Sequence, residues 1–269
     1  MTRAYVSRAR GPHCAHDRNY SSHSPTIMPS SALGEFLGTA VLILLGDGVV
    51  AGVLLDESKA KASGWIVITA GWAFAVLCGV LVASSLGAPG ELNPAVTIAN
   101  VLLGIRSVGD AAAHIGAQFA GAIVGATLVW IHYLDHWRAT KDADAIRGSF
   151  CCAPAIRSSV PNLLSEMIAT AVLVLVATAI GSKGVAGASP ATNLGPALVG
   201  ALVWGIGLSL GGPTGYAINP ARDLGPRIAH AILPIANKSH SDWSYSWIPV
   251  VGPVIGAACA AMLWRAVSI

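Results

Sequence analysis

Leu92-Asn93-Pro94-Ala95 and Ile218-Asn219-Pro220-Ala221 are two copies of one short motif. Asparagine is among the best residues for capping a helix N-terminus, and proline suits the first helical position because its missing N–H would have no partner there. Each copy therefore predicts the start of a helix. A single Asn-Pro pair is more often a simple turn, but two copies at equivalent places in a duplicated chain favour paired helix starts.

The duplication is visible on both sides of the motif. Residues 35–45 match residues 166–176 at six of eleven positions, and residues 121–126 resemble residues 252–257, both with an offset of 131. The two Asn-Pro motifs are 126 positions apart. Each half holds three long apolar runs, and an odd number of membrane crossings places the two halves in opposite orientations. Inverted repeats with broken helices are typical of proteins that bind a solute at the membrane midplane, between the halves.

The composition favours lipid as the solvent. Hydrophobic residues make up 54% of the 269 residues and charged residues only 11%, against about a quarter in a soluble domain. Six runs have a length near the ~20 residues that cross a bilayer: 31–55, 64–86, 111–134, 161–181, 194–210 and 247–266. The runs after the two motifs, 94–103 and 220–229, are half as long, and at about 1.5 Å per residue they reach half-way. The sequence predicts an all-α membrane protein with six transmembrane helices and two re-entrant half-helices.

The remaining composition places further limits on the chain. The net charge of +3 gives no reason to expect a nucleic-acid partner, and the five cysteines show no metal-site spacing, so neither a metal nor a cofactor is expected. Residues 1–30 differ from the rest and are interpreted as a disordered tail or as a misassigned start, with Met28 the first residue. Residues 31–269 then form one channel domain, with repeat one at 31–134, a loop at 135–160 and repeat two at 161–269.

The paired helix starts predict the chemistry of the midplane, which comprises Asn93, Pro94, Ala95, Asn219, Pro220 and Ala221. Two inverted half-helices meet start to start, so their positive dipole ends face each other across the path. A proton or cation there meets a positive potential, whereas water or a polyol meets amide donors. Irregular backbone at this depth is stable only where it is buried or lines a water-filled cavity. These residues predict a passive pore rather than an enzyme.

Residues 85–98 and 215–223 resemble the paired signature motifs of the aquaporin superfamily, and the resemblance extends from about residue 31 to the C-terminus. Within that superfamily the chain is most similar to the bacterial glycerol facilitators, because Asp223 directly follows Arg222 and Pro249-Val250 stands at the last span. The resemblance implies a homotetramer in the cell membrane, with one pore for glycerol and water in each subunit. It also implies a constriction near the extracellular mouth, formed by Trp72, Gly207, Tyr216 and Arg222.

The chemistry of those four residues fits a polyol. Arg222 offers several N–H donors to hydroxyl groups and repels cations. Trp72 and Tyr216 form an apolar wall for a carbon backbone, and Gly207, without a side chain, leaves the gap wide. Water channels usually have a histidine at the glycine position, which narrows the gap.

Three buried acids are expected to support the site. Glu35 and Glu166 lie inside spans, where ionisable side chains are costly. We expect each to accept hydrogen bonds from the irregular backbone next to a half-helix, because their positions are repeat-related. Asp223 is expected to orient Arg222 or its loop. Glu91 is a departure, since the family usually has a histidine two residues before the first motif asparagine.

Other functions are also compatible with parts of the sequence. A strict water channel is the first alternative, against which Gly207 and Asp223 argue, and a facilitator for propanediol, urea or another small neutral solute is a second. An ion-coupled transporter needs charged residues at the midplane beyond Glu35 and Glu166, and we identify none. An intramembrane enzyme could use Ser189 and His230, but no nucleophile motif surrounds Ser189.

Overall fold

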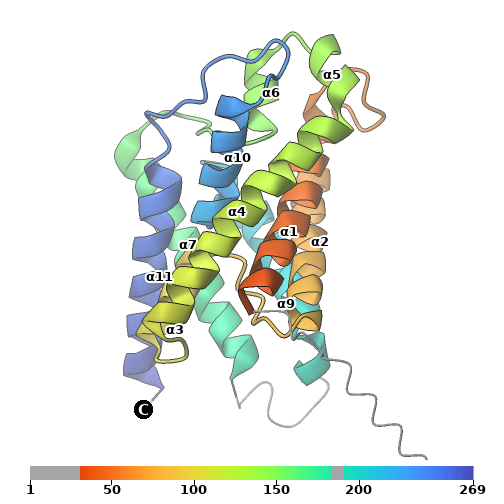
Figure 1. Cartoon of the computed structure of the whole chain (residues 1–269). Helices are drawn as coiled ribbons and strands as arrows, with labels where there is room; N and C mark the ends of the chain where they lie inside the picture. The colour runs from red at the N-terminus through yellow and green to blue at the C-terminus, as the bar shows by residue number, and fades with distance from the viewer. Residues whose placement is uncertain (1–30, 183–190, 269) are drawn as a thin grey trace, which may run out of the picture.

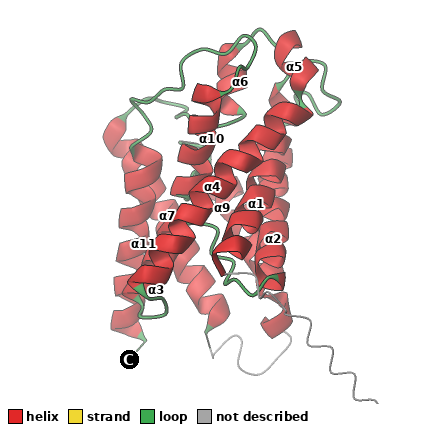
Figure 2. Ribbon diagram, viewed as in Figure 1, coloured by secondary structure: helices red, strands yellow, loops and turns green. Residues whose placement is uncertain are grey.

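The computed structural model describes residues 31–182 and 191–268, and in these two segments it is a bundle of α-helices without strands (Figure 2). Six long helices correspond to the six predicted spans: α1 (Ser31–Leu54), α2 (Trp65–Ser85), α4 (Val108–His132), α7 (Ser159–Gly181), α9 (Ala191–Leu210) and α11 (Ile248–Val267). The half-helices are α3 (Pro94–Leu102) and α10 (Pro220–Ile232). The structure therefore confirms the predicted fold class, and the predicted bounds agree with the observed ones to within three residues.

The long helices have the length and composition of membrane spans. Five of them, α1, α2, α4, α7 and α11, are long and apolar enough to cross a bilayer, and α9 contributes a further apolar helix over Leu194–Leu210. Large apolar side chains such as Phe74, Ile168 and Met262 are exposed on the outside of the bundle. Surfaces of this kind are rare on soluble monomers and fit contact with lipid.

The predicted loop 135–160 contains two short helices, α5 (Leu134–Ala139) and α6 (Ala143–Gly148). Asp142 begins α6, because its carboxylate accepts the backbone N–H groups of Asp144 and Ala145 at 2.9 and 3.1 Å. The two helices lie at one end of the bundle, the upper end in Figure 1. We call this end the α6 end and the opposite end, where α1 begins, the α1 end.

The two halves are packed in the same way. In the first half α1 packs against α2 and α4, and in the second α7 packs against α9 and α11. Glycines permit the close crossings, since a Cβ at Gly125 would lie 2.5 Å from the Ala40 carbonyl oxygen, and one at Gly256 would lie 2.2 Å from that of Met167. Small residues at such crossings are typical of helix packing in membranes.

The half-helices join the two halves to each other. The first-half helix α3 packs against α11, and the second-half helix α10 packs against α4. In Figure 1 α3 extends from the middle of the bundle toward the α1 end, and α10 extends from the middle toward the α6 end. Their N-termini therefore meet in the interior, and their C-termini point outward in opposite directions.

Candidate functional site

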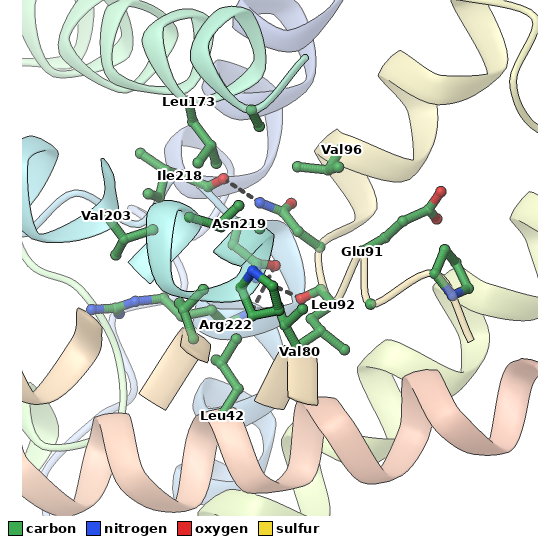
Figure 3. A pocket seen from close by; sticks show the side chains of 18 of the residues that line it. Leu42, Val80, Glu91, Leu92, Val96, Leu173, Val203, Ile218, Asn219 and Arg222 are labelled. Atoms are coloured by element: carbon green, nitrogen blue, oxygen red, sulfur yellow. Dashed lines mark hydrogen bonds between the residues drawn. The ribbon is translucent and has the colours of Figure 1, made fainter. Parts of the chain in front are cut away.

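Asn93 and Asn219 bind each other's loops at the centre of the bundle. The Asn93 side-chain amide donates to the Ile218 carbonyl at 2.8 Å, and the Asn219 amide donates to the Leu92 carbonyl at 2.8 Å (Figure 3). Each asparagine also caps its own half-helix, because its side-chain oxygen accepts the N–H of Ala95 or of Ala221. A side-chain amide carries two N–H groups, and this pattern uses one of them. Both asparagines line the central cavity, to which the second N–H is available.

The chain before each half-helix is held in an unusual conformation. Leu92 and Ile218 have φ values of +50° and +46°, and Tyr216 has +40°. A left-handed conformation is unfavourable for residues with a bulky side chain, at a cost of roughly 1–3 kcal/mol for each residue. The surrounding structure must offset this cost, and it does so through two buried carboxylates.

Glu35 and Glu166 bind these two strained segments. The Glu35 carboxylate accepts the N–H groups of Glu91 and Leu92 at 2.9 and 2.7 Å. The Glu166 carboxylate accepts those of Ala217 and Ile218 at 3.0 and 2.8 Å. Both carboxylates are fully buried, and hydrogen bonds to a charged acceptor contribute about 1.5–3 kcal/mol each. With its N–H groups bound on one side, each segment can present its carbonyl groups to the cavity on the other.

The central cavity has a volume of about 350 Å³, and both apolar and polar groups line it. The apolar side chains come from the long helices and from α3, among them Leu42, Val76, Val80, Val96, Leu173 and Val203. The polar groups come from the two irregular segments, 89–92 and 216–218, and from the paired asparagines. Figure 3 shows the apolar side chains around Asn219 and Arg222. The cavity can therefore take a solute that has both hydrogen-bonding groups and carbon-rich surface.

Three of the four predicted constriction residues lie together at the α6 side of the cavity. Trp72, Tyr216 and Arg222 all line it. The Arg222 guanidinium lies 4.2 Å from the centroid of the Trp72 ring, a cation–π distance, and donates to the Cys152 sulfur at 2.8 Å. A donor group and two aromatic side chains thus line the same cavity.

Gly207, the fourth predicted constriction residue, packs against the Tyr216 ring. It does not appear among the described residues that line the cavity, because the Tyr216 ring covers it. A Cβ at residue 207 would lie 2.8 Å from Tyr216 Cζ and 2.9 Å from Thr69 Cγ2. Gly207 therefore provides the space into which the Tyr216 ring packs, and its effect on the width of the pore is indirect.

Asp223 binds the loop at the α6 end rather than Arg222. Its carboxylate accepts from Arg227 at 2.9 and 3.0 Å and from the Cys152 N–H at 2.8 Å. Arg227 also donates to the carbonyl groups of Cys152 and Ser241. This buried pair fixes the position of Cys152, whose sulfur contacts Arg222. Of the two alternatives in the sequence analysis, the contacts favour the loop.

Cys151 and Cys152, the cysteines at this end, are free thiols. Burial raises the pKa of the Cys151 thiol to about 12. Burial likewise raises the pKa of Cys152 well above its ordinary value. Both side chains therefore remain protonated at neutral pH, and Cys152 can accept the hydrogen bond from Arg222 as a neutral thiol.

Glu91 is the centre of a polar cluster near the α1 end of the cavity, which it lines. Its carboxylate accepts from Thr97 and Asn100, both at 2.7 Å, and from Arg106 at 3.2 and 3.3 Å. His114 Nδ1 lies 3.4 Å from the same carboxylate. The acid that stands where the family usually has a histidine therefore joins α3, α4 and the segment between them.

Asp47 is an acidic residue that the sequence analysis missed. It lies within α1, its side chain is buried, and its Oδ2 atom has no hydrogen-bond partner among the residues that the structure describes. Glu35 and Glu166 are therefore not the only buried acids inside the described spans. An aspartate between two glycines in an apolar run, Gly46-Asp47-Gly48, was the available signal.

The residues considered for an enzyme do not form a described site. Ser189 lies outside the described residues, and His230 is buried with its Nδ1 atom 2.8 Å from the Ser241 hydroxyl. That contact joins α10 to the loop that follows it.

Comparison with known proteins agrees with the fold and with the site. The family described as major intrinsic protein matches residues 23–264, and the chain belongs to this family of integral membrane proteins. Glycerol uptake facilitator protein 3 of Lactiplantibacillus plantarum is 54% identical over 233 residues, which cover 87% of this chain and 95% of that protein. The glycerol uptake facilitator protein of Streptococcus pneumoniae strain R6 is 53% identical over 237 residues, covering 88% and 99%.

A solved structure has the same fold. The X-ray structure of the aquaglyceroporin from Plasmodium falciparum matches with a TM-score of 0.76 and 28% sequence identity, and the match covers 88% of this chain and 96% of that one. The relatives are described as facilitators and as an aquaglyceroporin, which agrees with a channel-forming protein. The resemblance inferred from the two Asn-Pro motifs is confirmed.

Proposed function

We propose that the chain is a passive channel for glycerol and related small uncharged solutes, water among them, and that it excludes protons and ions. The observation that carries this proposal is the cavity, which is lined by apolar side chains together with polar groups and by Trp72, Tyr216 and Arg222. Glycerol has hydroxyl groups along one edge and C–H groups along the other. The carbonyl groups of the irregular segments, Asn93, Asn219 and Arg222 suit the hydroxyls, and the apolar side chains suit the carbon backbone.

Exclusion of protons follows from the two half-helices. Their N-termini meet at Asn93 and Asn219, so the positive ends of both dipoles lie at the same point of the path. Arg222 adds a fixed positive charge at the constriction. A neutral solute meets these groups as hydrogen-bond donors, whereas a cation meets them as a barrier.

Proteoliposomes test the proposal directly. The purified full-length chain is reconstituted, and stopped-flow light scattering follows the volume of the vesicles after addition of glycerol, propanediol, urea or an impermeant osmolyte. We expect glycerol influx well above that of protein-free vesicles. We also expect no proton influx, which a pH-sensitive dye inside the vesicles would report. Water permeability without glycerol influx would favour the strict water channel, and a rapid dye response would contradict proton exclusion.

The assembly is proposed to be a homotetramer with one pore in each subunit, on the resemblance to the family. The exposed apolar side chains of the bundle are compatible with either lipid or subunit contacts. Native mass spectrometry of the detergent-solubilised protein distinguishes a tetramer from a monomer. Because each subunit encloses its own cavity, dissociation is expected to leave the pore itself complete.

A further inference from the structure

Asp47 is a buried acid that is not among the described residues lining the central cavity. Its side chain lies within the apolar helix α1, and the residue is 2% exposed. Its Oδ2 atom has no hydrogen-bond partner among the described residues. An isolated charged carboxylate in such surroundings is costly, so an acid inside a span either binds a proton or has a charged partner.

Among the arginines and aspartates that the structure describes near the constriction, Asp47 and Arg222 have no direct ionic contact. Asp223 and Arg227 are paired, with N–O distances of 2.9 and 3.0 Å, and both are fully buried. The contacts of the Arg222 guanidinium in the described part of the chain are the Cys152 sulfur and the Trp72 ring, which are both neutral. The Arg222 charge also reaches Glu166, but that carboxylate is already bound by two backbone N–H groups and by the Thr214 hydroxyl.

Trp72 connects these two residues in space. A Cβ on Gly46 would lie 2.3 to 2.5 Å from the six-membered ring of Trp72, so this ring packs directly on the turn of α1 that carries Asp47. The Arg222 guanidinium lies over the same indole, 4.2 Å from the ring centroid. Burial is the largest influence on the Asp47 carboxyl group and disfavours its charged form, and the charge of Asp223 acts in the same sense. The charge of Arg222 acts in the opposite sense and favours the ionised carboxylate.

We propose that Asp47 is the counter-ion of Arg222. Asp47 lies in the α1 turn on which the Trp72 ring packs, and its carboxylate balances part of the guanidinium charge through space, so that the constriction keeps the donors of Arg222 with a smaller net positive charge. This inference rests on the proposed function and specifies how one residue of its constriction is partly neutralised. It makes Asp47 a positioning residue for charge, outside the path of the solute.

The proposal predicts which charge remains at the constriction when Arg222 is replaced. In Arg222→Ala the positive charge is lost while the Asp47 carboxylate stays near a widened constriction, so a negative potential replaces a partly balanced one. Small cations should then pass. Removing the second charge in Arg222→Ala, Asp47→Asn should close this leak, although the gap is as wide as in the single variant.

The experiment uses full-length protein in proteoliposomes that contain a sodium-sensitive dye, and glycerol influx is measured on the same vesicles. Arg222→Ala is expected to raise sodium influx at least tenfold above the parent, and the double variant to return it to within about twofold of the parent. The matched control is Arg222→Ala, Asp56→Asn, which neutralises a partly exposed aspartate just beyond the end of α1 and should leak as Arg222→Ala does. A double variant with Asp47→Asn that leaks as much as Arg222→Ala, or an Arg222→Ala protein that conducts glycerol without any leak, would overturn the proposal.

The single variant Asp47→Asn gives an independent measurement. Here the guanidinium charge is unbalanced, so influx of a small anion such as formate is expected to rise about fivefold while sodium influx stays at background. Unchanged formate influx in a protein that conducts glycerol would contradict the counter-ion role. If the parent chain passes no glycerol, the proposed function itself fails, and this result is distinct from either outcome for Asp47.

Discussion

Glu35 and Glu166 bind equivalent backbone groups in the two inverted halves of the chain. Each carboxylate accepts the N–H groups of two consecutive residues before a half-helix. Their remaining partners differ, because Glu35 also accepts from the Gln118 amide at 2.9 Å and Glu166 from the Thr214 hydroxyl at 2.6 Å. The duplication has therefore preserved the contact with the backbone, whereas the side chains that complete it have diverged.

This symmetry predicts equal damage from Glu35→Gln and Glu166→Gln. A glutamine has one acceptor oxygen, and its NH2 group would face the second backbone N–H, so at least one charged hydrogen bond is lost, at about 1.5–3 kcal/mol. Both variants should unfold at lower temperature in detergent and conduct less glycerol. Glu57→Gln, an exposed glutamate outside the helices, is the matched control and should unfold with the parent. Damage confined to one of the two variants would contradict an equivalent role.

The Glu91 cluster predicts coupled effects of two substitutions. Glu91→Gln removes an acceptor that binds Thr97, Asn100 and Arg106, and Arg106→Gln removes the cation of the same cluster. Residues that share one network are not additive in their effects on stability. The double variant should therefore be about as stable as the worse single variant, and glycerol influx should fall in all three. Fully additive losses of melting temperature would show that the two residues act separately.

The loop at the α6 end predicts a dependence of stability on pH. Burial raises the pKa of Asp242, but hydrogen bonds from Arg157 and Ser244 outweigh this and hold the pKa below its ordinary value. An acid with a lowered pKa in the folded protein stabilises it at neutral pH, and this contribution is lost as the pH falls below about 4. Asp242→Asn should thus lower the melting temperature at pH 7 by more than it does at pH 3.

Asp242 has a φ of +49°, which asparagine also tolerates, so the substitution changes the charge with little change in backbone preference. The control is Asp135→Asn, because the Asp135 side chain is 91% exposed and its ion pair with Arg138 lies at the surface. This control should unfold at the same temperature as the parent at both pH values. If the melting temperature of Asp242→Asn is below that of the parent by the same amount at pH 7 and at pH 3, the Asp242 charge does not cause the difference.

The helices of this fold can be predicted from sequence because each depends on a local pattern. Apolar runs give the long helices, and the Asn-Pro pairs give the starts of α3 and α10 at Pro94 and Pro220. The short helices α5 and α6 are harder to predict, because neither has a long apolar run. Asp142 caps α6, but an aspartate in a loop is not by itself enough to predict a helix start.

The parts of the site that sequence could not supply depend on contacts between distant segments. The hydrogen bond from Arg222 to Cys152 joins α10 to a loop 70 residues earlier, and no periodicity indicates that this loop folds over the constriction. The packing of the Tyr216 ring on Gly207 likewise depends on a left-handed conformation at Tyr216 that residue type does not predict. The sequence therefore indicated that residue 207 lacks a side chain, but not that the Tyr216 ring packs on it.

The contact between Gly207 and Tyr216 predicts the effect of a single methyl group. Gly207→Ala places a Cβ 2.8 Å from Tyr216 Cζ, which is closer than such atoms approach in proteins, so the tyrosine ring must move. Because the ring lines the cavity, we expect glycerol influx to fall at least fivefold while water permeability changes less. Gly205→Ala is the matched control, since a Cβ at residue 205 meets open space, and it should conduct as the parent does.

The same contact determines how the chain could be converted into a narrower channel. An imidazole at residue 207 and the Tyr216 ring cannot occupy the same space, so Gly207→His with Trp72→Phe also requires Tyr216→Ala. In this triple variant the imidazole narrows the gap and replaces apolar wall with a polar group. A glycerol hydroxyl left without a partner in the constriction costs roughly 1–3 kcal/mol, or about one to two decades of flux if this step limits the rate. Stopped-flow assays should therefore show that most glycerol influx is lost and water permeability is kept. Parental glycerol influx in a correctly assembled triple variant would show that Trp72, Gly207 and Tyr216 do not determine selectivity.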